Sequence, residues 1–260
     1  MKIDLNCIDK SMLSGKVAFV SDASAGIAEE VIRLFSMAGA AVAFNAKDSK
    51  QAEKVKSTVE AQGARCKAFN FSCLDAENIK QMVLEAEKEL GEIQILVNYC
   101  DFEENIPFTE TDEEKWNRMI ELQLTNAYRF CHAVVPGMIE AGYGKIINVS
   151  SLSAKTGGYV VGAGIHYCAA EGGLLGLSRG LAMQLAENNI TVNSVCPSIV
   201  DIEAEKSRNK DELDVLKKEL PFNRFADPLE IAGGVLFLAS PFTSWITGYS
   251  LDINGGLFMD

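Results

Sequence analysis

The stretch VAFVSDASAGIAEEVIRLFSMAG, from Val17 to Gly39, decides the fold. Its first four residues form an apolar run of strand length, and a polar turn follows directly. Beyond the turn, apolar residues recur at helical spacing up to Gly39, a residue type that commonly ends helices. These apolar positions are Ile27, Val31, Leu34, Phe35 and Ala38. We therefore predict a strand, a tight turn and an amphipathic helix, which is the opening unit of a doubly wound α/β fold.

The same alternation continues along the chain. Further strands are predicted at 40–44, 66–71, 93–98, 145–149, 190–195 and 249–253, and further helices at 48–62, 75–90, 112–136, 165–188 and 228–239. IQILVN and KIINV are continuous apolar runs, as expected for central parallel strands that are buried on both faces. The prediction is a single domain over residues 1–260, with a seven-stranded parallel Rossmann sheet flanked by helices. Ligands of such sheets bind at the carboxyl ends of the strands.

Composition narrows the classes of function. The net charge of -12 argues against binding to nucleic acid or to an anionic membrane. No run approaches the roughly 20 apolar residues that cross a bilayer, and the start of the chain is too polar for a secretory signal, so a soluble cytoplasmic protein is expected. The seven cysteines never form a CxxC pair, and His132 and His166 are the two histidines. We expect no metal site, and thiols that are reduced and mostly buried.

The segment from residue 200 to residue 220, DIEAEKSRNKDELDVLKKEL after Val200, is highly charged and lacks a clean apolar stripe. We interpret it as an excursion over the edge of the sheet that forms part of any lid over the ligand site.

Several segments together resemble one family, the short-chain dehydrogenases/reductases. They are VAFVSDASAGIA, ILVNYC, GKIINVSSLSA, a tyrosine that opens a long helix, ITVNSVCPS, PFNRFADPLEIA and ITGYSLDINGG. The match is collinear over essentially the whole chain. The resemblance implies a Rossmann domain that binds NAD(H) or NADP(H) and moves hydride to or from an alcohol carbon. It also implies a tyrosine as acid/base, assisted by serine, lysine and asparagine.

The family's nucleotide turn, TGxxxGxG, reads SDASAGIA here, from Ser21 to Ala28, and keeps only Gly26. Ala28 is a mild change, because the last position serves helix–strand packing. Asp22 puts a carboxylate where the backbone should approach an anionic pyrophosphate. Two unit charges about 4 Å apart at an effective dielectric of about 20 repel by about 4 kcal/mol, which is roughly a thousandfold in affinity. We therefore expect no cofactor on this chain.

Other cofactor positions also differ from the family pattern, and several of the changes disfavour a bound dinucleotide. Asn98 is kept from the family's NNAG, but the positions after it add side chains near the adenosine site. Three aspartates, at positions 22, 101 and 201, add negative charge near an anion-binding face. In the following positions this chain has a residue other than the family's: Asp101 for the glycine of NNAG, Ser72 for an aspartate that contacts adenine, Ser198 for the glycine of a PG motif, Asp201 near a threonine that binds phosphate, and Ala46 for the acidic residue of NAD-preferring members. Lys47 would favour a 2′-phosphate.

Two of the four catalytic positions fit the family and two are altered. Tyr167 matches the catalytic tyrosine, and Ser151 matches the serine that hydrogen-bonds the substrate oxygen. The family's lysine is Glu171 here, a carboxylate that would favour neutral tyrosine rather than phenolate. The family's asparagine aligns with Gln123, whose longer side chain disturbs the proton relay. Of the histidines, His166 is expected to be a surface or satisfied side chain, because it points about 100° away from Tyr167 on the helix, and His132 is expected to pack.

Three hypotheses follow. The first is a non-catalytic subunit that supports a second, intact member of the family in a hetero-oligomer, with a tetramer plausible. That arrangement resembles the heteromeric hydroxyacyl-CoA dehydrogenases of the benzylsuccinate pathway, in which one subunit is degenerate; it places NAD(H) or NADP(H) on the partner and makes an acyl-CoA a possible substrate of the complex. The second is an active NAD(P)-dependent oxidoreductase of a secondary alcohol or ketone that uses Tyr167 and Ser151. The third is small-ligand binding, or a non-redox function, in the old cleft.

Overall fold

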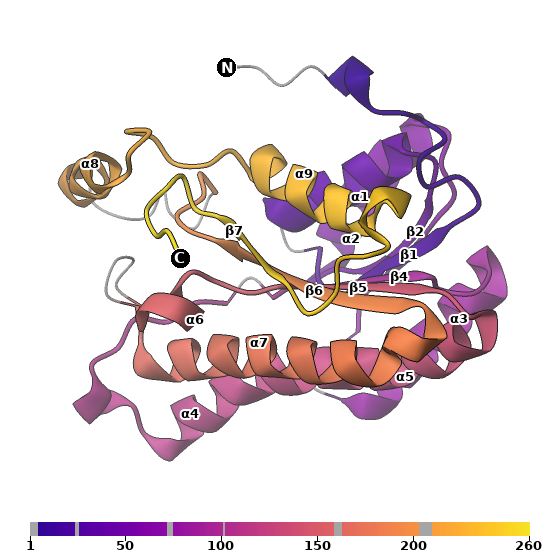
Figure 1. Ribbon diagram of the computed structural model, residues 1–260. Helices are drawn as coiled ribbons and strands as arrows, with labels where there is room; N and C mark the ends of the chain where they lie inside the picture. The colour runs from indigo at the N-terminus through magenta and orange to yellow at the C-terminus, as the bar shows by residue number, and fades with distance from the viewer. Residues whose placement is uncertain (1–4, 24–25, 72–74, 101, 159–162, 203–209) are drawn as a thin grey trace.

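The strands of the described residues form one parallel sheet in the order β3-β2-β1-β4-β5-β6-β7 (Figure 1). The computed structural model describes residues 5–23, 26–71, 75–100, 102–158, 163–202 and 210–260. Its strands are β1 (Val17–Val20), β2 (Ala41–Asn45), β3 (Cys66–Phe69), β4 (Ile95–Asn98), β5 (Gly144–Val149), β6 (Ile190–Pro197) and β7 (Ser250–Ile253). The predicted seven-stranded, doubly wound sheet is confirmed.

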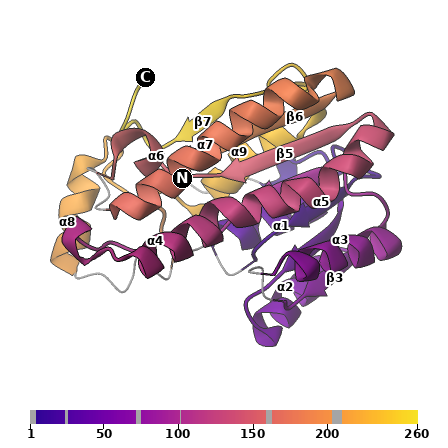
Figure 2. The same cartoon turned by 90° about the horizontal axis from the view of Figure 1, so that it is seen from below.

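Helices cover both faces of this sheet (Figures 1 and 2). On one face lie α1, α2 and α9, and on the other α3, α5 and α7. The helices are α1 (Ile27–Met37), α2 (Ser49–Ala61), α3 (Ala76–Leu90), α4 (Glu113–Ile120), α5 (Asn126–Ala141), α6 (Ser153–Thr156), α7 (Ile165–Leu185), α8 (Lys210–Glu219) and α9 (Pro228–Ala239). The order of strands reverses between β1 and β4, so a crevice for a ligand is expected at the carboxyl ends of these two strands.

The sheet has one hydrophobic core on each face, because successive side chains of a strand point to opposite faces of the sheet. On β1, Ala18 and Val20 join the core under α1 and α9. Val17 and Phe19 join the core over α3, α5 and α7. Every residue of β1, β2, β4, β5 and β6 is buried, which is why these strands read as apolar runs without alternation.

The long helix predicted over residues 112–136 is divided and longer than expected. It consists of α4, a π-helical turn at Glu121–Thr125, and α5. The predicted end at Pro136 is wrong, because the buried stripe continues from Val134 to Met138 and outweighs the helix-breaking tendency of proline. The helix ends at Gly142, which adopts the left-handed conformation at φ 63°.

The charged segment also departs from expectation. It contains α8, and apolar side chains at helical spacing (Leu213, Leu216 and Leu220) pack against Ile199 and Phe225. The sequence reading that this segment lacks an apolar stripe was therefore wrong; the stripe is narrow and is masked by charged neighbours. In both views α8 lies at the same end of the molecule as α6 (Figures 1 and 2).

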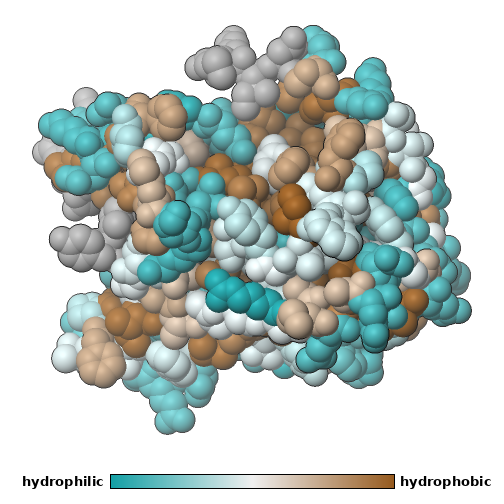
Figure 3. All heavy atoms as spheres, in the orientation of Figure 1, coloured by the Kyte–Doolittle hydropathy of each residue, from teal (hydrophilic) through white to brown (hydrophobic). Residues whose placement is uncertain are grey.

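Further expectations concerned the thiols, metal binding and membrane spans. Among the cysteines that the structure describes, Cys131 and Cys196 are buried, whereas the others are half-buried or exposed, so the expectation of mostly buried thiols was wrong. In the part of the chain that the structure describes, no group of three or more His, Cys, Asp or Glu side chains could hold a metal ion, and none of the helices there has the length and apolarity to span a bilayer. On the face drawn in Figure 3, hydrophobic and hydrophilic residues are intermixed.

Candidate functional site

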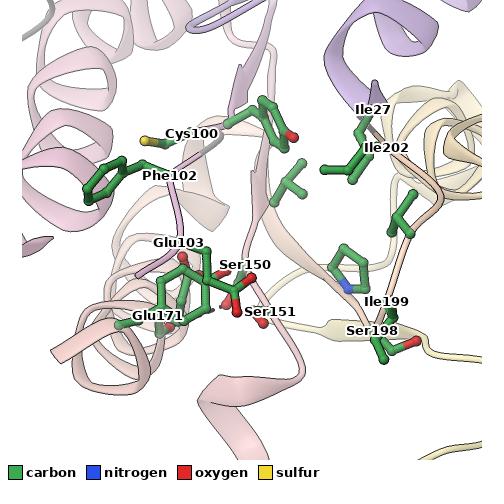
Figure 4. A pocket seen from close by; sticks show the side chains of 15 residues that line it. Ile27, Cys100, Phe102, Glu103, Ser150, Ser151, Glu171, Ser198, Ile199 and Ile202 are labelled. Atoms are coloured by element: carbon green, nitrogen blue, oxygen red, sulfur yellow. Dashed lines mark hydrogen bonds between the residues drawn. The ribbon is translucent and has the colours of Figure 1, made fainter. Parts of the chain in front are cut away.

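A pocket opens at the carboxyl ends of the central strands, where the doubly wound topology predicts a ligand (Figure 4). Its empty volume is about 710 Å³ including the open mouth. The side chains that line it come from the loops after β4, β5 and β6 and from the starts of α1 and α7. They are Ile27, Tyr99, Cys100, Phe102, Glu103, Val149, Ser150, Ser151, Tyr167, Glu171, Pro197, Ser198, Ile199, Val200 and Ile202.

Tyr167 and Ser151 meet in this pocket, as the sequence predicts. Tyr167 is the third residue of α7 and is 9% exposed, and Ser151 follows the end of β5. Burial raises the pKa of the tyrosine well above its usual value of 10.0, and the carboxyl groups of Glu171 and Glu103 raise it further. A side-chain hydrogen bond from Ser151 acts in the opposite direction. The phenol is therefore held in its neutral form at neutral pH.

Glu171 lies one helical turn after Tyr167 and reaches the same side of α7. It is 2% exposed, and its Oε2 has no hydrogen-bond partner. Burial raises the pKa of this carboxyl group to about 8, against a hydrogen bond from Ser150 that lowers it. The sequence argument treated Glu171 as a charged carboxylate, whereas burial makes the neutral acid the main form at pH 7.

The turn after β1 is closed by a side chain from another loop. Gly26 has φ 61° and ψ -114° at the start of α1, a backbone conformation that favours glycine. A Cβ built on Gly26 would lie 2.6 Å from Cγ2 of Ile202. Figure 4 shows Ile27 and Ile202 together at one wall of the pocket. Asp22 is half-buried and does not line the pocket.

Gln123 and Asn98 do not reach this pocket. Gln123 lies in the π-helical turn and donates its Nε2 hydrogen to the carbonyl of Phe102. The Asn98 side chain donates to Oδ1 of Asn148 over 2.7 Å, and Asn148 donates to Oγ of Ser178 over 2.7 Å. Asn98 therefore ties β4 to β5 and α7 inside the core, although its own Oδ1 has no partner. Both residues line a smaller cavity behind the pocket.

The remaining predicted cofactor positions are spread over the sheet edge. Ala28 and Ala46 are buried in the core, and Lys47 is exposed. Ser198 lines the pocket and donates to the carbonyl of Asn254 over 3.2 Å, whereas Asp201 is exposed outside it. Ser72 and Asp101 lie outside the described residues.

The two histidines occupy different environments. His166 is fully buried, with Nε2 3.3 Å from Oε2 of Glu104 and Nδ1 unpartnered. It does not line the pocket. Because it is neither at the surface nor hydrogen-bonded at both nitrogens, the expectation of a surface or satisfied histidine was wrong. His132 lies within α5, where its exposed ring packs beside the ring of Tyr128, at 5.8 Å between centroids.

The sequence reading missed several residues of the pocket. Glu103 and Phe102 come from the loop after β4, and Ile202 comes from the segment after β6. Their position just beyond the carboxyl ends of two central strands is the signal that points to them. The contact between Ile202 and Gly26 joins residues far apart in the chain, and no local pattern predicts it.

Comparisons with known proteins agree with this architecture. A family model described as Enoyl-(Acyl carrier protein) reductase matches residues 23–258. The 3-oxoacyl-(acyl-carrier-protein) reductase FabG of Vibrio harveyi is 34% identical over 248 residues, covering 95% of this chain and 99% of that protein. The short-chain dehydrogenase/reductase from Serratia marcescens BCRC 10948 has a TM-score of 0.89 at 32% identity, covering 95% of this chain and 99% of that one. The chain belongs to the short-chain dehydrogenase/reductase family.

Similarity extends to relatives with other names. Nodulation protein G of Rhizobium sp. (strain N33) is 30% identical and covers 95% of this chain and 98% of its own length. In this chain Tyr167 and Ser151 lie together in one pocket with a buried acid, Glu171. The Ile202 side chain lies against Gly26 at the start of α1.

Proposed function

We propose that this chain is a subunit that does not transfer hydride itself and that supports an intact second member of the short-chain dehydrogenase/reductase family in a hetero-oligomer. The observation that carries the proposal is Glu171, a buried acid with an unpartnered oxygen one turn after Tyr167. In the family, a lysine at this position would hold the nicotinamide ribose and lower the pKa of the tyrosine.

The residues around the nucleotide turn do not fit a dinucleotide. Cγ2 of Ile202 fills the space directly beside Gly26, where the family's backbone approaches the pyrophosphate. The described pocket-lining residues include no lysine, arginine or histidine to balance the phosphate charge, and they include two carboxyl groups. Of these two, Glu171 is mainly neutral at pH 7, so what an anionic ligand would lack is a balancing cation among the described lining residues.

The surroundings of Tyr167 also oppose its action as a base. A tyrosine acts as a base only after losing its proton, and here the pKa of Tyr167 is raised by burial and by two nearby acids. A general base works best with a pKa near the operating pH. The Ser151 hydrogen bond is a smaller effect of opposite sign and does not replace the missing cation.

The outward face of α7 supports association with a partner. Ile165, Ala169, Gly176, Gly180 and Met183 recur at helical spacing and are exposed, and a Cβ at Gly176 or Gly180 would meet no atom within 4 Å. Small residues allow a second helix to approach closely, and Met183 at 84% exposure offers apolar area. We infer that an intact sibling packs there and carries the NAD(H) or NADP(H), as in the benzylsuccinate-pathway enzymes, with an acyl-CoA as the substrate class of the complex.

Calorimetric titration of the purified chain with NADH and NADPH tests the proposal. We expect no binding at concentrations where active relatives are saturated, because the described lining residues include no cation and Ile202 lies against Gly26. A Glu171→Lys, Ile202→Gly double variant reverses both features and should gain measurable affinity. Micromolar affinity of the unchanged chain would contradict the proposal.

A second candidate function is an active reductase of a 3-oxoacyl thioester, by analogy with the named activity of the Vibrio harveyi relative. The specific observation in its favour is that Tyr167 and Ser151 share one pocket and a hydrogen bond. On this alternative the purified chain oxidises NADPH in the presence of acetoacetyl-CoA, and Tyr167→Phe abolishes the activity. Absence of turnover with both coenzymes would remove this candidate.

A further inference from the structure

Another pocket opens at the amino ends of β1, β2 and β3, the edge of the sheet opposite the candidate functional site. Its empty volume is about 810 Å³ including the open mouth. The residues that line it belong to the segment before β1, the turn from α1 to β2 and the turn from α2 to β3, within residues 10–16, 36–41 and 62–65. Three separate loops therefore form one concave site.

The charged residues that line this pocket are basic. They are Lys10, Lys16 and Arg65, and the described lining includes no aspartate or glutamate. Acidic residues outnumber basic ones in the chain, 36 to 24, and cations elsewhere, such as Lys155, pair with carboxylates. No ion pair joins any of the three pocket cations to a described carboxyl group. Their positive charge is therefore available to a ligand.

Two of the three cations are held by neutral groups. Arg65 donates an Nη2 hydrogen to the carbonyl of Leu90 over 3.0 Å, which leaves further N–H donors of the guanidinium for a ligand. The Lys16 ammonium lies 3.9 Å from the centroid of the Tyr143 ring. Burial raises the pKa of Tyr143, so its phenol is neutral at pH 7. Neither contact cancels the charge of the cation that makes it.

The nearest acids along the chain are engaged in other contacts. One Asp9 oxygen accepts from the backbone N–H and the hydroxyl of Ser11, over 2.8 and 2.7 Å. Glu60 pairs with Lys56 over 3.8 Å. Neither acid is among the described residues that line the pocket.

The ends of α1 and α2 lie beside the pocket, where cations also favour the negative end of a helix. Backbone bonds already cap both ends, because the amides of Gly39 and Gly63 donate to carbonyls of the last turns over 3.1 and 2.9 Å. A Cβ built on Gly15 or Gly63 would meet no atom within 4 Å. The backbone at these two glycines therefore borders open space that a ligand can enter.

We propose that this pocket binds a small anion that carries a terminal phosphate group, with Arg65 and Lys10 as its main charged contacts and Lys16 adding to the positive field. A guanidinium matches two oxygens of one phosphate group. A terminal phosphate carries about -1.5 to -2 charges at neutral pH, so it gains more from three cations than a carboxylate does. The net charge of -12 does not prevent this, because charges beyond about 10 Å are screened by salt.

This site lies outside the proposed function and does not depend on it. The pocket with Tyr167 is at the carboxyl ends of the strands, and the basic pocket is at their amino ends. A phosphate-bearing ligand can therefore occupy the basic pocket whether or not the chain transfers hydride.

The test titrates the full chain with inorganic pyrophosphate, inorganic phosphate and acetate by calorimetry at low ionic strength. We expect pyrophosphate to bind with a Kd below about 1 mM, phosphate to bind more weakly, and acetate not to bind. Raising the salt from about 20 mM to about 200 mM should weaken pyrophosphate binding at least about fivefold, because exposed charges are screened. In NMR spectra of the labelled chain, pyrophosphate should shift the amide signals of Gly15 and Gly63.

Variants of the exposed cations identify the contacts. Arg65→Gln should weaken pyrophosphate binding by about tenfold, because charge-assisted hydrogen bonds are lost, and Arg65→Lys should retain part of it. Lys10→Gln should weaken it by about threefold. Lys50→Gln removes an exposed lysine at the start of α2, outside the pocket, and should leave binding unchanged. Equal melting temperatures would show that the variants fold.

Three results would overturn the inference. They are equal binding by the wild type and a Lys10→Gln, Arg65→Gln double variant, shifts confined to Gly26 and Ser151, and no pyrophosphate binding at about 10 mM. Lower melting temperatures of the variants without any pyrophosphate binding would assign the cations to the helix ends and overturn it as well. NADH binding that the double variant leaves unchanged would instead count against the proposed function.

Discussion

At the scale of single residues, Glu171 connects stability and function. Its side chain is buried beside Tyr167, and the environment holds it in the protonated form at neutral pH. The folded protein therefore binds a proton here that the unfolded chain, with a carboxyl pKa near 4.5, has already lost. The stability of the folded protein therefore depends on the protonation of Glu171.

The first prediction concerns the pH dependence of unfolding. A raised carboxyl pKa in the folded state means that the stabilisation is present below pH 4.5 and is lost as pH rises through about 8. Glu171→Gln keeps the shape without a titrating group. We expect its free energy of unfolding to exceed that of the wild type increasingly across this window, by at most about 1.4 kcal/mol per pH unit. Urea unfolding at several pH values measures the difference.

A surface acid provides the control for this experiment. Glu140→Gln should give a curve parallel to that of the wild type, because Glu140 is exposed on α5. If the Glu171→Gln curve were also parallel to the wild type, Glu171 would not be protonated in the folded protein.

At the scale of elements, the start of α9 is built by a reciprocal cap. The Asp227 side chain accepts from the backbone N–H of Leu229 over 2.9 Å, and Glu230 accepts from the backbone N–H of Asp227 over 2.8 Å. Pro228 occupies the first turn, and Arg224 donates to both oxygens of Glu230. This anchors α9 beneath the loop that carries Val200, which pairs with Ala226.

The second prediction is the cost of removing this cap. Asp227→Ala leaves the amides of the first turn of α9 without their acceptor, so we expect a loss of about 1 kcal/mol in the free energy of unfolding. Thermal unfolding and urea titration would measure it. Asp214→Ala, in an exposed interior position of α8, should change stability by less than half of that amount. Equal losses in both variants would argue against the cap.

At the scale of the whole molecule, the outward face of α7 is the surface on which a partner is proposed to dock. The helix lies at the edge of its layer in both ribbon views (Figures 1 and 2). Trp245, at 99% exposure, and Phe242, at 80%, add apolar surface at the C-terminal part of the chain. Exposed aromatic residues of this size are enriched in protein interfaces.

The third prediction tests that surface. Gly176→Arg places a large charged side chain on the outward face of α7, where no atom of this chain lies within 4 Å of the added Cβ. We expect the monomer to be as stable as the wild type or more so, because arginine favours helix over glycine. The complex with the sibling subunit should be lost, as measured by native mass spectrometry of the tagged chain purified from its own host.

The matched variant is Leu84→Arg, on the exposed side of α3. It introduces the same side chain at a different surface and should leave the complex intact. Assembly that survives Gly176→Arg but not Leu84→Arg would move the interface to α3. A chain that purifies as a homotetramer with dehydrogenase activity of its own would contradict the hetero-oligomer.

Sequence alone reached the architecture because local patterns carry it. The apolar runs at Val17–Val20 and 145–149 mark strands buried on both faces, and Gly91 marks the end of α3. Two local readings failed. The end of α5 was placed too early, at Pro136, although the buried stripe continues to Met138. The helix α8 was missed because charged residues surround Leu213 and Leu216.

The candidate site was also predicted from the sequence only in part. Tyr167, Ser151 and Glu171 could be identified from the sequence because the collinear family segments assign each of them a position. The charge state of Glu171, the closing of the turn at Gly26 by Ile202, and the entry of Glu103 into the pocket were decided by the tertiary structure. Burial and contact between distant segments set these properties, because a pKa depends on the surrounding dielectric and charges and a cavity depends on packing, neither of which a linear pattern encodes.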